Sequence, residues 1–119
     1  SSDLGGNERG GERQGVEVIT FTLDGCNACA DLKDRLRNEG VSFRNISIDE
    51  NPKLGDALEK EYLTEYYPIV QIVDSKSKNA YYTFVSESQL KGFKIVNWEI
   101  FESRLKETEL KNKFEKIRF

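Results

Sequence analysis

Hydrophobic residues recur along this chain with two different periods, and each period predicts one kind of secondary structure. Between Val16 and Leu23, apolar and β-branched residues are dense enough to predict a strand that is buried on both faces. Shorter runs of similar composition predict three more strands. We place the four strands at residues 16–23, 41–48, 69–73 and 80–85. Between these runs apolar residues recur every three or four positions, which predicts helices. We place these helices at residues 27–39 and 52–62 and from residue 98 onward.

The first predicted helix carries its apolar residues on one face. These residues are Ala28, Cys29, Leu32 and Leu36, which follow one another at helical spacing. This phase directs Cys29 toward the core and leaves Cys26 at the exposed start of the helix.

The chain divides into a polar segment and one domain. Residues 1–14 are polar and rich in glycine, so they can bury little apolar surface, and we expect a flexible polar tail. Residues 15–119 are expected to form a single domain. The apolar spacing of the last helix shifts between Leu105 and Leu110. We interpret this shift as a C-terminal extension that bends over the domain or contacts a partner.

The composition argues against several classes of function. The net charge is −3 and no dense basic stripe is present, so we expect no nucleic-acid partner. No apolar run approaches the ~20 residues of a membrane helix, so we expect no membrane contact. The chain has no His, which excludes Ser-His and Cys-His catalysis and His-ligated metals. Two Cys residues alone cannot complete a closed zinc site, and we expect neither a metal nor another cofactor.

The two Cys residues carry the strongest chemical signal. Cys26 and Cys29 are separated by Asn27 and Ala28, between a predicted strand and a predicted helix. This spacing lets both sulfurs meet across one helical turn, so that they can close a small, reversible disulfide. At a helix N-terminus, unpaired backbone N–H groups and the helix dipole favour the Cys26 thiolate, which is the nucleophilic form. A C-x-x-C motif beside a β-α-β pattern indicates thioredoxin-like redox chemistry.

Three motifs in the same order resemble the thioredoxin and glutaredoxin superfamily over about residues 16–105. They are Cys26-Asn27-Ala28-Cys29 after the first strand, Ile48-Asp49-Glu50-Asn51-Pro52 at the second helix, and Tyr67-Pro68-Ile69-Val70 at the third strand. The resemblance implies an α/β thioredoxin-like fold, in which a central four-stranded mixed sheet is flanked by three helices. It also implies that the Tyr67–Pro68 peptide bond is cis and faces the Cys pair.

The same resemblance implies an enzyme that performs thiol–disulfide exchange. Cys26 would be the attacking nucleophile, and Cys29 would be the resolving thiol. Pro68 would place a non-coordinating ring beside the sulfurs, and the backbone of Tyr67 would pair with an extended substrate as a short added strand.

The implied substrate contacts and partners follow from this activity. Asn27, Ala28 and Tyr67 are the expected substrate-binding residues. The side chains of Tyr66 and Tyr67 either face the substrate or belong to the core, and the sequence leaves both interpretations open. The expected partners are a disulfide-containing protein or small molecule, and a reductase or small thiol that recycles the Cys pair. A cytoplasmic location is expected, because the chain has no further Cys residues for structural disulfides.

Several positions depart from the superfamily pattern and keep other interpretations open. Thioredoxins carry a buried Asp where this chain has Thr20, and the Lys that glutaredoxins carry before the motif is absent. Asp24 and Asp31 flank the Cys pair, and we predict that their negative charge weakens the thiolate. One alternative is a thioredoxin-fold binding or adaptor module whose Cys pair is vestigial or regulatory. Another is a metal or cluster carrier that uses thiolates from two subunits.

Overall fold

The computed structural model describes residues 12–13, 15–85 and 98–117. In chain order these residues form β1 (Glu12–Arg13), β2 (Val16–Thr22), α2 (Asn27–Asn38), β3 (Arg44–Ser47), α3 (Pro52–Tyr62), β4 (Ile69–Asp74), β5 (Ala80–Phe84) and α4 (Trp98–Ile117). The flexible tail that we predict for residues 1–14 lies outside the described residues, except for β1. Among the described residues, regular structure begins at Glu12, shortly before residue 15, where we expect the domain to start.

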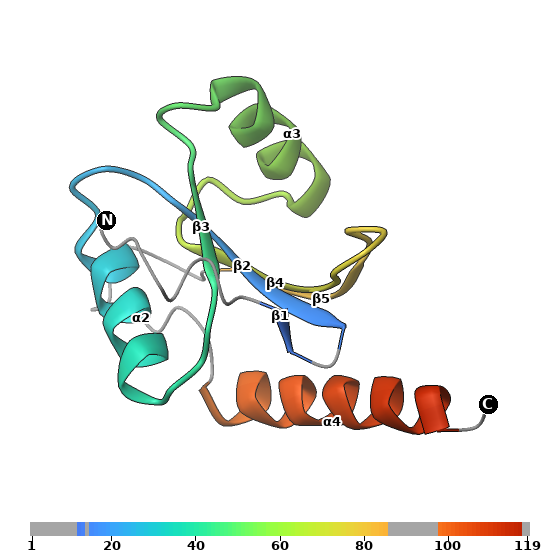
Figure 1. Ribbon diagram of the computed structural model, residues 1–119. Helices are drawn as coiled ribbons and strands as arrows, with labels where there is room; N and C mark the ends of the chain where they lie inside the picture. Colours follow the sequence, from blue (N-terminus) through green and yellow to red (C-terminus); the bar gives the residue numbers. More distant parts are fainter. Residues whose placement is uncertain (1–11, 14, 86–97, 118–119) are drawn as a thin grey trace.

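The strands form one mixed sheet around β2 (Figure 1). β3 runs parallel to β2, with Arg44 opposite Ile19, and β1 pairs antiparallel with the first residues of β2. β4 lies antiparallel to β2, with Ile69 opposite Phe21, and β5 continues the sheet beyond β4. The predicted four-stranded mixed sheet is thereby confirmed, and β1 adds a short fifth strand.

Helices cover both faces of the sheet, as expected for an α/β fold of this kind. α3 lies above the sheet in Figure 1, and α4 lies below it. Leu36 of α2 and Phe101 of α4 are buried in one apolar cluster with Val18 and Ile72 of the sheet, so α2 and α4 share a face. Leu58 of α3 belongs to a second cluster on the opposite face. These two clusters confirm the thioredoxin-like architecture with three flanking helices.

The second predicted strand is shorter than we expect from its apolar residues. β3 begins at Arg44, whereas the prediction begins it at residue 41. Val41 donates its backbone N–H to the Leu36 carbonyl at 2.8 Å, so this residue still belongs to the turn that ends α2. Val41 and Phe43 are nevertheless buried in the core. Their apolar character therefore reflects packing against α2, and it does not reflect strand pairing.

α3 buries a glycine where a larger apolar residue is usual. The helical spacing of Ala57 to Leu54 and Leu58 predicts a place on the apolar stripe of this helix. That prediction is wrong, because Ala57 is exposed and Gly55 is buried. A Cβ atom at Gly55 would lie only 2.7 Å from Ile48 Cγ2. The helix therefore approaches the sheet edge more closely than any side chain at position 55 would allow without movement.

α4 is one continuous helix that leaves the core along its length. Phe101 and Leu105 are buried, whereas Leu110 is 53% exposed. The predicted change of apolar face after Leu105 therefore matches a loss of core contact. Among the described residues, no helix combines the length and the apolar character that crossing a membrane requires.

Candidate active site

The loop after β2 places Cys26 at the start of α2. Gly25 adopts a positive φ of 70°, a left-handed conformation that favours glycine and turns the chain away from the sheet. Cys26 is the N-cap of α2, and its Sγ accepts a hydrogen bond from the Cys29 backbone N–H at 3.1 Å. The Cys26 carbonyl accepts the first helical hydrogen bond from Ala30 N–H, also at 3.1 Å. The sulfur thus takes the place of the oxygen of a usual N-cap side chain and receives the positive end of the helix dipole.

Cys26 and Cys29 are joined in a disulfide, with 5.2 Å between their Cα atoms. Their environments differ strongly. Cys29 is 1% exposed and packs among core residues, whereas Cys26 is only half-buried. This difference agrees with the helical phase, although Cys26 is less exposed than the sequence predicts. A reagent from solvent can therefore approach the sulfur of Cys26 more readily than that of Cys29.

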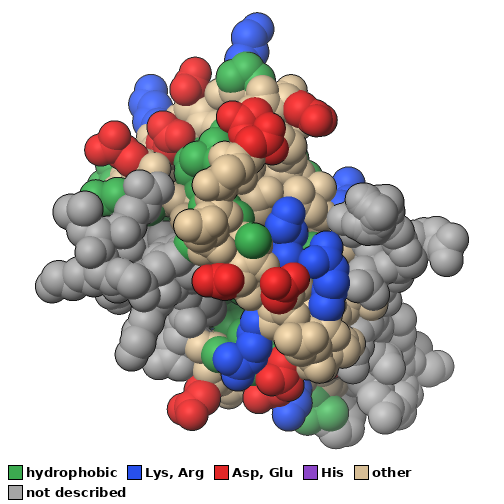
Figure 2. Space-filling view, turned by 90° about the vertical axis from the view of Figure 1, so that its left-hand side faces the viewer, with side chains coloured by type: hydrophobic (Ala, Val, Ile, Leu, Met, Phe, Trp, Pro, Cys, Tyr) green, Lys and Arg blue, Asp and Glu red, His purple; other side chains and the backbone are tan. Residues whose placement is uncertain are grey.

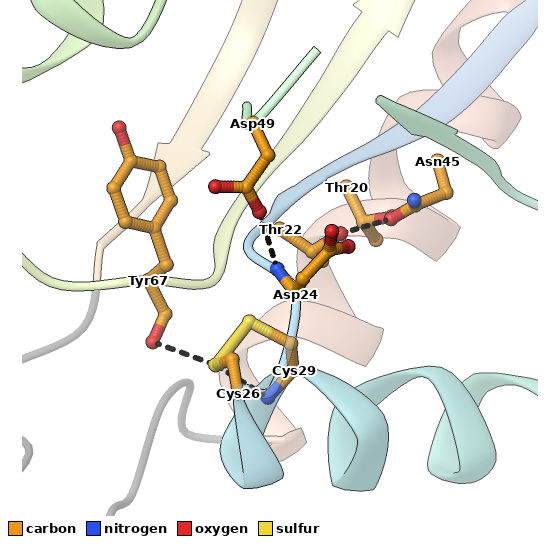
Figure 3. The surroundings of a disulfide bond; sticks show 8 residues. All are labelled: Thr20, Thr22, Asp24, Cys26, Cys29, Asn45, Asp49 and Tyr67. Atoms are coloured by element: carbon orange, nitrogen blue, oxygen red, sulfur yellow. Dashed lines mark hydrogen bonds between the residues drawn. A yellow bond between two sulfur atoms is a disulfide. The ribbon is translucent and has the colours of Figure 1, made fainter. Parts of the chain in front are cut away.

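The loop before β4 completes the surroundings of the disulfide. The Tyr67–Pro68 peptide bond is cis. The Tyr67 carbonyl oxygen lies 3.8 Å from Cys26 Sγ, and Figure 3 shows it pointing at that sulfur. Tyr67 and Cys26 come from separate elements, since the loop before β4 carries one and the start of α2 carries the other. The antiparallel pairing of β2 with β4 brings these two loops to the same edge of the sheet.

The side chain of Tyr67 points away from the disulfide (Figure 3). It is 1% exposed, and its hydroxyl donates a hydrogen bond to Glu59 Oε2 at 2.9 Å. Burial, followed by the nearby Glu59 carboxylate, raises the pKa of Tyr67 above its ordinary value. The interpretation that this side chain faces the substrate is therefore wrong, because the ring fills the core under α3. Only the backbone of Tyr67 faces the Cys pair.

The other predicted substrate contacts lie beside Cys26. Asn27 is exposed and Ala28 is half-buried, and both lie in the first turn of α2. Tyr66 is half-buried, and its backbone N–H donates to Thr64 Oγ1 at 3.1 Å. The substrate-binding role of Asn27 and Ala28 stays a prediction.

A neutral polar cluster lies beneath the end of β2. Thr20 and Thr22 both donate hydrogen bonds to Asn45 Oδ1, at 2.8 and 2.9 Å (Figure 3). Thr20 is fully buried and stands where thioredoxins carry an Asp. Sequence reasoning missed the role of Asn45, although two threonines on one face of a strongly apolar strand signal a buried polar partner. Cys29 therefore has no carboxylate at the Thr20 position to accept its proton.

The loops at this edge of the sheet are acidic. They carry the exposed carboxylates of Asp24, Asp49, Glu50 and Glu65. Residues 23–26, 48–51 and 63–68 contain neither Lys nor Arg. Figure 2 looks onto the side of the molecule that carries α2, and acidic side chains gather over its upper part. Arg35 on α2 forms an ion pair with a carboxylate of its own helix, Glu39.

Asp49 also has a specific contact that the sequence did not suggest. Its Oδ2 accepts a hydrogen bond from the backbone N–H of Asp24 at 2.6 Å (Figure 3).

Among the residues that the structure describes, no cluster of three or more Cys, Asp or Glu side chains could hold a metal ion.

Comparison with known proteins agrees with this geometry. The glutaredoxin family model matches residues 18–76. N-acetyl-S-hydroxy-L-cysteine reductase from Bacillus subtilis (strain 168) is 33% identical over 57 residues. The matching segment covers 48% of this chain and 61% of the relative, so it spans less than two thirds of that protein. The matched residues include the Cys pair, the cis Pro68 and most of the strands that position them, and these matches confirm the resemblance to the thioredoxin/glutaredoxin superfamily.

Proposed function

We propose that this protein is a thiol–disulfide oxidoreductase that reduces disulfides of proteins or small molecules with Cys26 and Cys29. The observation that carries the proposal is the position of Cys26 Sγ, which accepts the Cys29 N–H at 3.1 Å at the N-terminus of α2. Hydrogen bonding to the charged form favours that form, so this arrangement stabilises the Cys26 thiolate after reduction.

The reaction begins with the reduced pair. The Cys26 thiolate attacks one sulfur of the substrate disulfide, forms a mixed disulfide and releases the other substrate sulfur as a thiolate. Cys29 then loses its proton and attacks Cys26 Sγ. This step forms the Cys26–Cys29 disulfide and releases the second substrate sulfur. Two electrons have then passed to the substrate, and an external small thiol or a reductase must return two electrons to the pair.

The surroundings of the sulfurs suggest how a substrate binds. We propose that an extended substrate segment pairs with the backbone of Tyr67, next to the cis Pro68. Asn27 and Ala28 would contact the substrate on the other side of Cys26. The burial of Cys29 supports its role as the resolving thiol, because a substrate reaches Cys26 first.

A second substrate class is suggested by the name of the relative. That protein is named as a reductase of N-acetyl-S-hydroxy-L-cysteine, whose S-hydroxy group is a sulfenic acid. With such a substrate the Cys26 thiolate would displace hydroxide, which becomes water on protonation, and Cys29 would resolve the mixed disulfide as before. The same Cys pair would thus serve both classes. We also propose a reducing compartment such as the cytoplasm, where a thiol pool can recycle the pair.

The reduction potential of the Cys pair tests the proposal first. The protein is equilibrated in graded thiol–disulfide buffers, and alkylated thiols are counted by mass spectrometry. A reversible two-electron transition between about −270 and −120 mV, with turnover that Cys26→Ser abolishes, supports the enzyme. A pair that stays oxidised below about −300 mV, or that never closes, favours the binding or adaptor module. Visible absorbance after anaerobic purification would favour the metal or cluster carrier.

A further inference from the structure

The turn that carries Cys26 has few contacts of its own. Asp24 and Gly25 are both exposed, and a Cβ atom built at Gly25 would meet no other atom within 4 Å. Packing therefore restrains Asp24 and Gly25 only weakly, although Leu23 and Cys26 on either side contact the second core cluster. The hydrogen bonds on either side of Gly25 add to these contacts in holding Cys26 in place.

One of these attachments is the start of α2, and the other is Asp49. The parallel ladder of β2 and β3 ends with Thr22 opposite Ser47, and the Ile48 N–H still donates to the Thr22 carbonyl at 2.8 Å. Beyond this point the two chains separate. The Asp49 carboxylate then accepts the Asp24 N–H at 2.6 Å, so a side chain supplies the acceptor that the ladder no longer offers.

Asp49 is well placed to act as a fixed point. It follows Ile48, which is 6% exposed and belongs to the core cluster that also contains Cys29. Its partner, the Asp24 backbone, lies two residues before Cys26. In Figure 3 the Asp24 backbone lies between Asp49 and the disulfide.

We propose that Asp49 is a positioning residue for the redox reaction, because it fixes the turn from which Cys26 Sγ reaches both the Cys29 N–H and Cys29 Sγ. This inference rests on the proposed redox function of the Cys pair. In this role the Asp49 carboxylate oxygen acts as a hydrogen-bond acceptor for the Asp24 N–H. An amide oxygen can perform the same task, since it also accepts hydrogen bonds.

Three variants separate the hydrogen bond from the charge. Asp49→Ala removes both, Asp49→Asn removes the charge and keeps an acceptor, and Glu50→Gln removes one charge from the same loop as a matched control. The equilibrium constant for closing the disulfide is measured against a glutathione buffer. We expect it to fall about fivefold to tenfold in Asp49→Ala, as for the loss of one charge-assisted hydrogen bond, and less than about twofold in the other two variants.

Alkylation provides a readout that does not need substrate turnover. Iodoacetamide is reacted with the reduced variants at pH 7, and the labelled residue is identified by mass. Cys26 should react about threefold more slowly in Asp49→Ala than in Asp49→Asn, because both lack the charge and only one keeps the acceptor. A loss of fold stability alone would lower the melting temperature without this difference.

The outcomes distinguish the two proposals. Asp49→Ala behaving like the wild type, or Asp49→Asn and Glu50→Gln behaving like Asp49→Ala, would overturn the positioning role. If the wild-type pair closes no reversible disulfide, the proposed function fails. The ratio of the Cys26 alkylation rates of Asp49→Asn and Asp49→Ala then tests the positioning role alone, and a ratio near one would refute that role.

Discussion

Replacing Tyr67 by Phe tests whether this residue stabilises the fold or contacts the substrate. The variant keeps the buried ring and removes the hydroxyl that donates to Glu59 at 2.9 Å. A hydrogen bond to a charged group contributes about 1.5–3 kcal/mol, but Glu59 is half-buried and water can replace part of the bond. We therefore expect the free energy of unfolding to fall by about 1 kcal/mol at pH 7.

The pH dependence of this difference gives a sharper test. The pKa of Tyr67 is raised in the folded protein by burial and by Glu59, so the folded state keeps a proton that the unfolded state loses above pH ~10. The stabilising effect of the hydroxyl is complete below that pH and declines as the pH rises toward the folded pKa. The wild type should lose about 1.4 kcal/mol relative to Tyr67→Phe between pH 9 and 11.

Urea unfolding of the oxidised protein measures both effects. The Lys residues and the other Tyr residues titrate alike in both proteins. Their contribution therefore cancels when the free energies of unfolding of the two proteins are subtracted. Tyr81→Phe is the matched control, because Tyr81 is 44% exposed and its replacement should change stability by less than about 0.5 kcal/mol. Equal stability of Tyr67→Phe and wild type at pH 7, or a difference that stays constant up to pH 11, would refute the reasoning. Disulfide reduction by Tyr67→Phe should match the wild type.

Three further predictions concern packing, polarity and substrate charge. Gly55→Ala should lower the free energy of unfolding by about 1 kcal/mol in urea, because crowding against Ile48 outweighs the gain in helix propensity, and a more stable variant would contradict this. Thr20→Val should also cost about 1 kcal/mol while Cys26 alkylation stays unchanged, whereas a changed alkylation rate would mean that the polar cluster acts on the thiol. At low salt the protein should reduce the dication cystamine on the order of tenfold faster than the dianion dithiodipropionate, after each rate is divided by the rate of the same compound with dithiothreitol. The acidic loops attract the cation and repel the anion, so the preference should decline at about 0.5 M salt. Equal normalised rates at low salt would contradict this.

Features that depend on neighbouring residues could be predicted from the sequence. The burial of Cys29 follows from its helical spacing to Leu32 and Leu36, and the position of Cys26 at the helix start follows from the Gly25 turn. Both features involve residues within one or two helical turns. The order of strands and helices was also readable, because each element has its own apolar period. That order, together with the three motifs, carries the resemblance that implied the fold class.

Several contacts between distant segments could not be predicted from the local pattern. Glu17 lies in the buried strand β2, where an unpaired charge would be costly, and it forms ion pairs with Lys78 at 2.7 Å and Arg44 at 3.3 Å. Asn45 interrupts the apolar alternation of β3 because its side-chain oxygen accepts a hydrogen bond from Thr20 on the neighbouring strand. These partners lie on other elements. Their meeting depends on strand register, which the local pattern does not contain.

The surroundings of Cys26 therefore include residues outside the motif that identifies it. β2 and β3 are parallel and β4 is antiparallel to β2, so the loops that carry Asp24, Asp49 and Tyr67 must meet at one edge of the sheet. A C-x-x-C helix by itself would supply the N-cap hydrogen bond to the sulfur. It would supply neither the acceptor for the Asp24 N–H nor the carbonyl that lies 3.8 Å from Cys26 Sγ. The position of the Cys26 sulfur thus involves the contacts of Asp49 and Tyr67 as well as the motif itself.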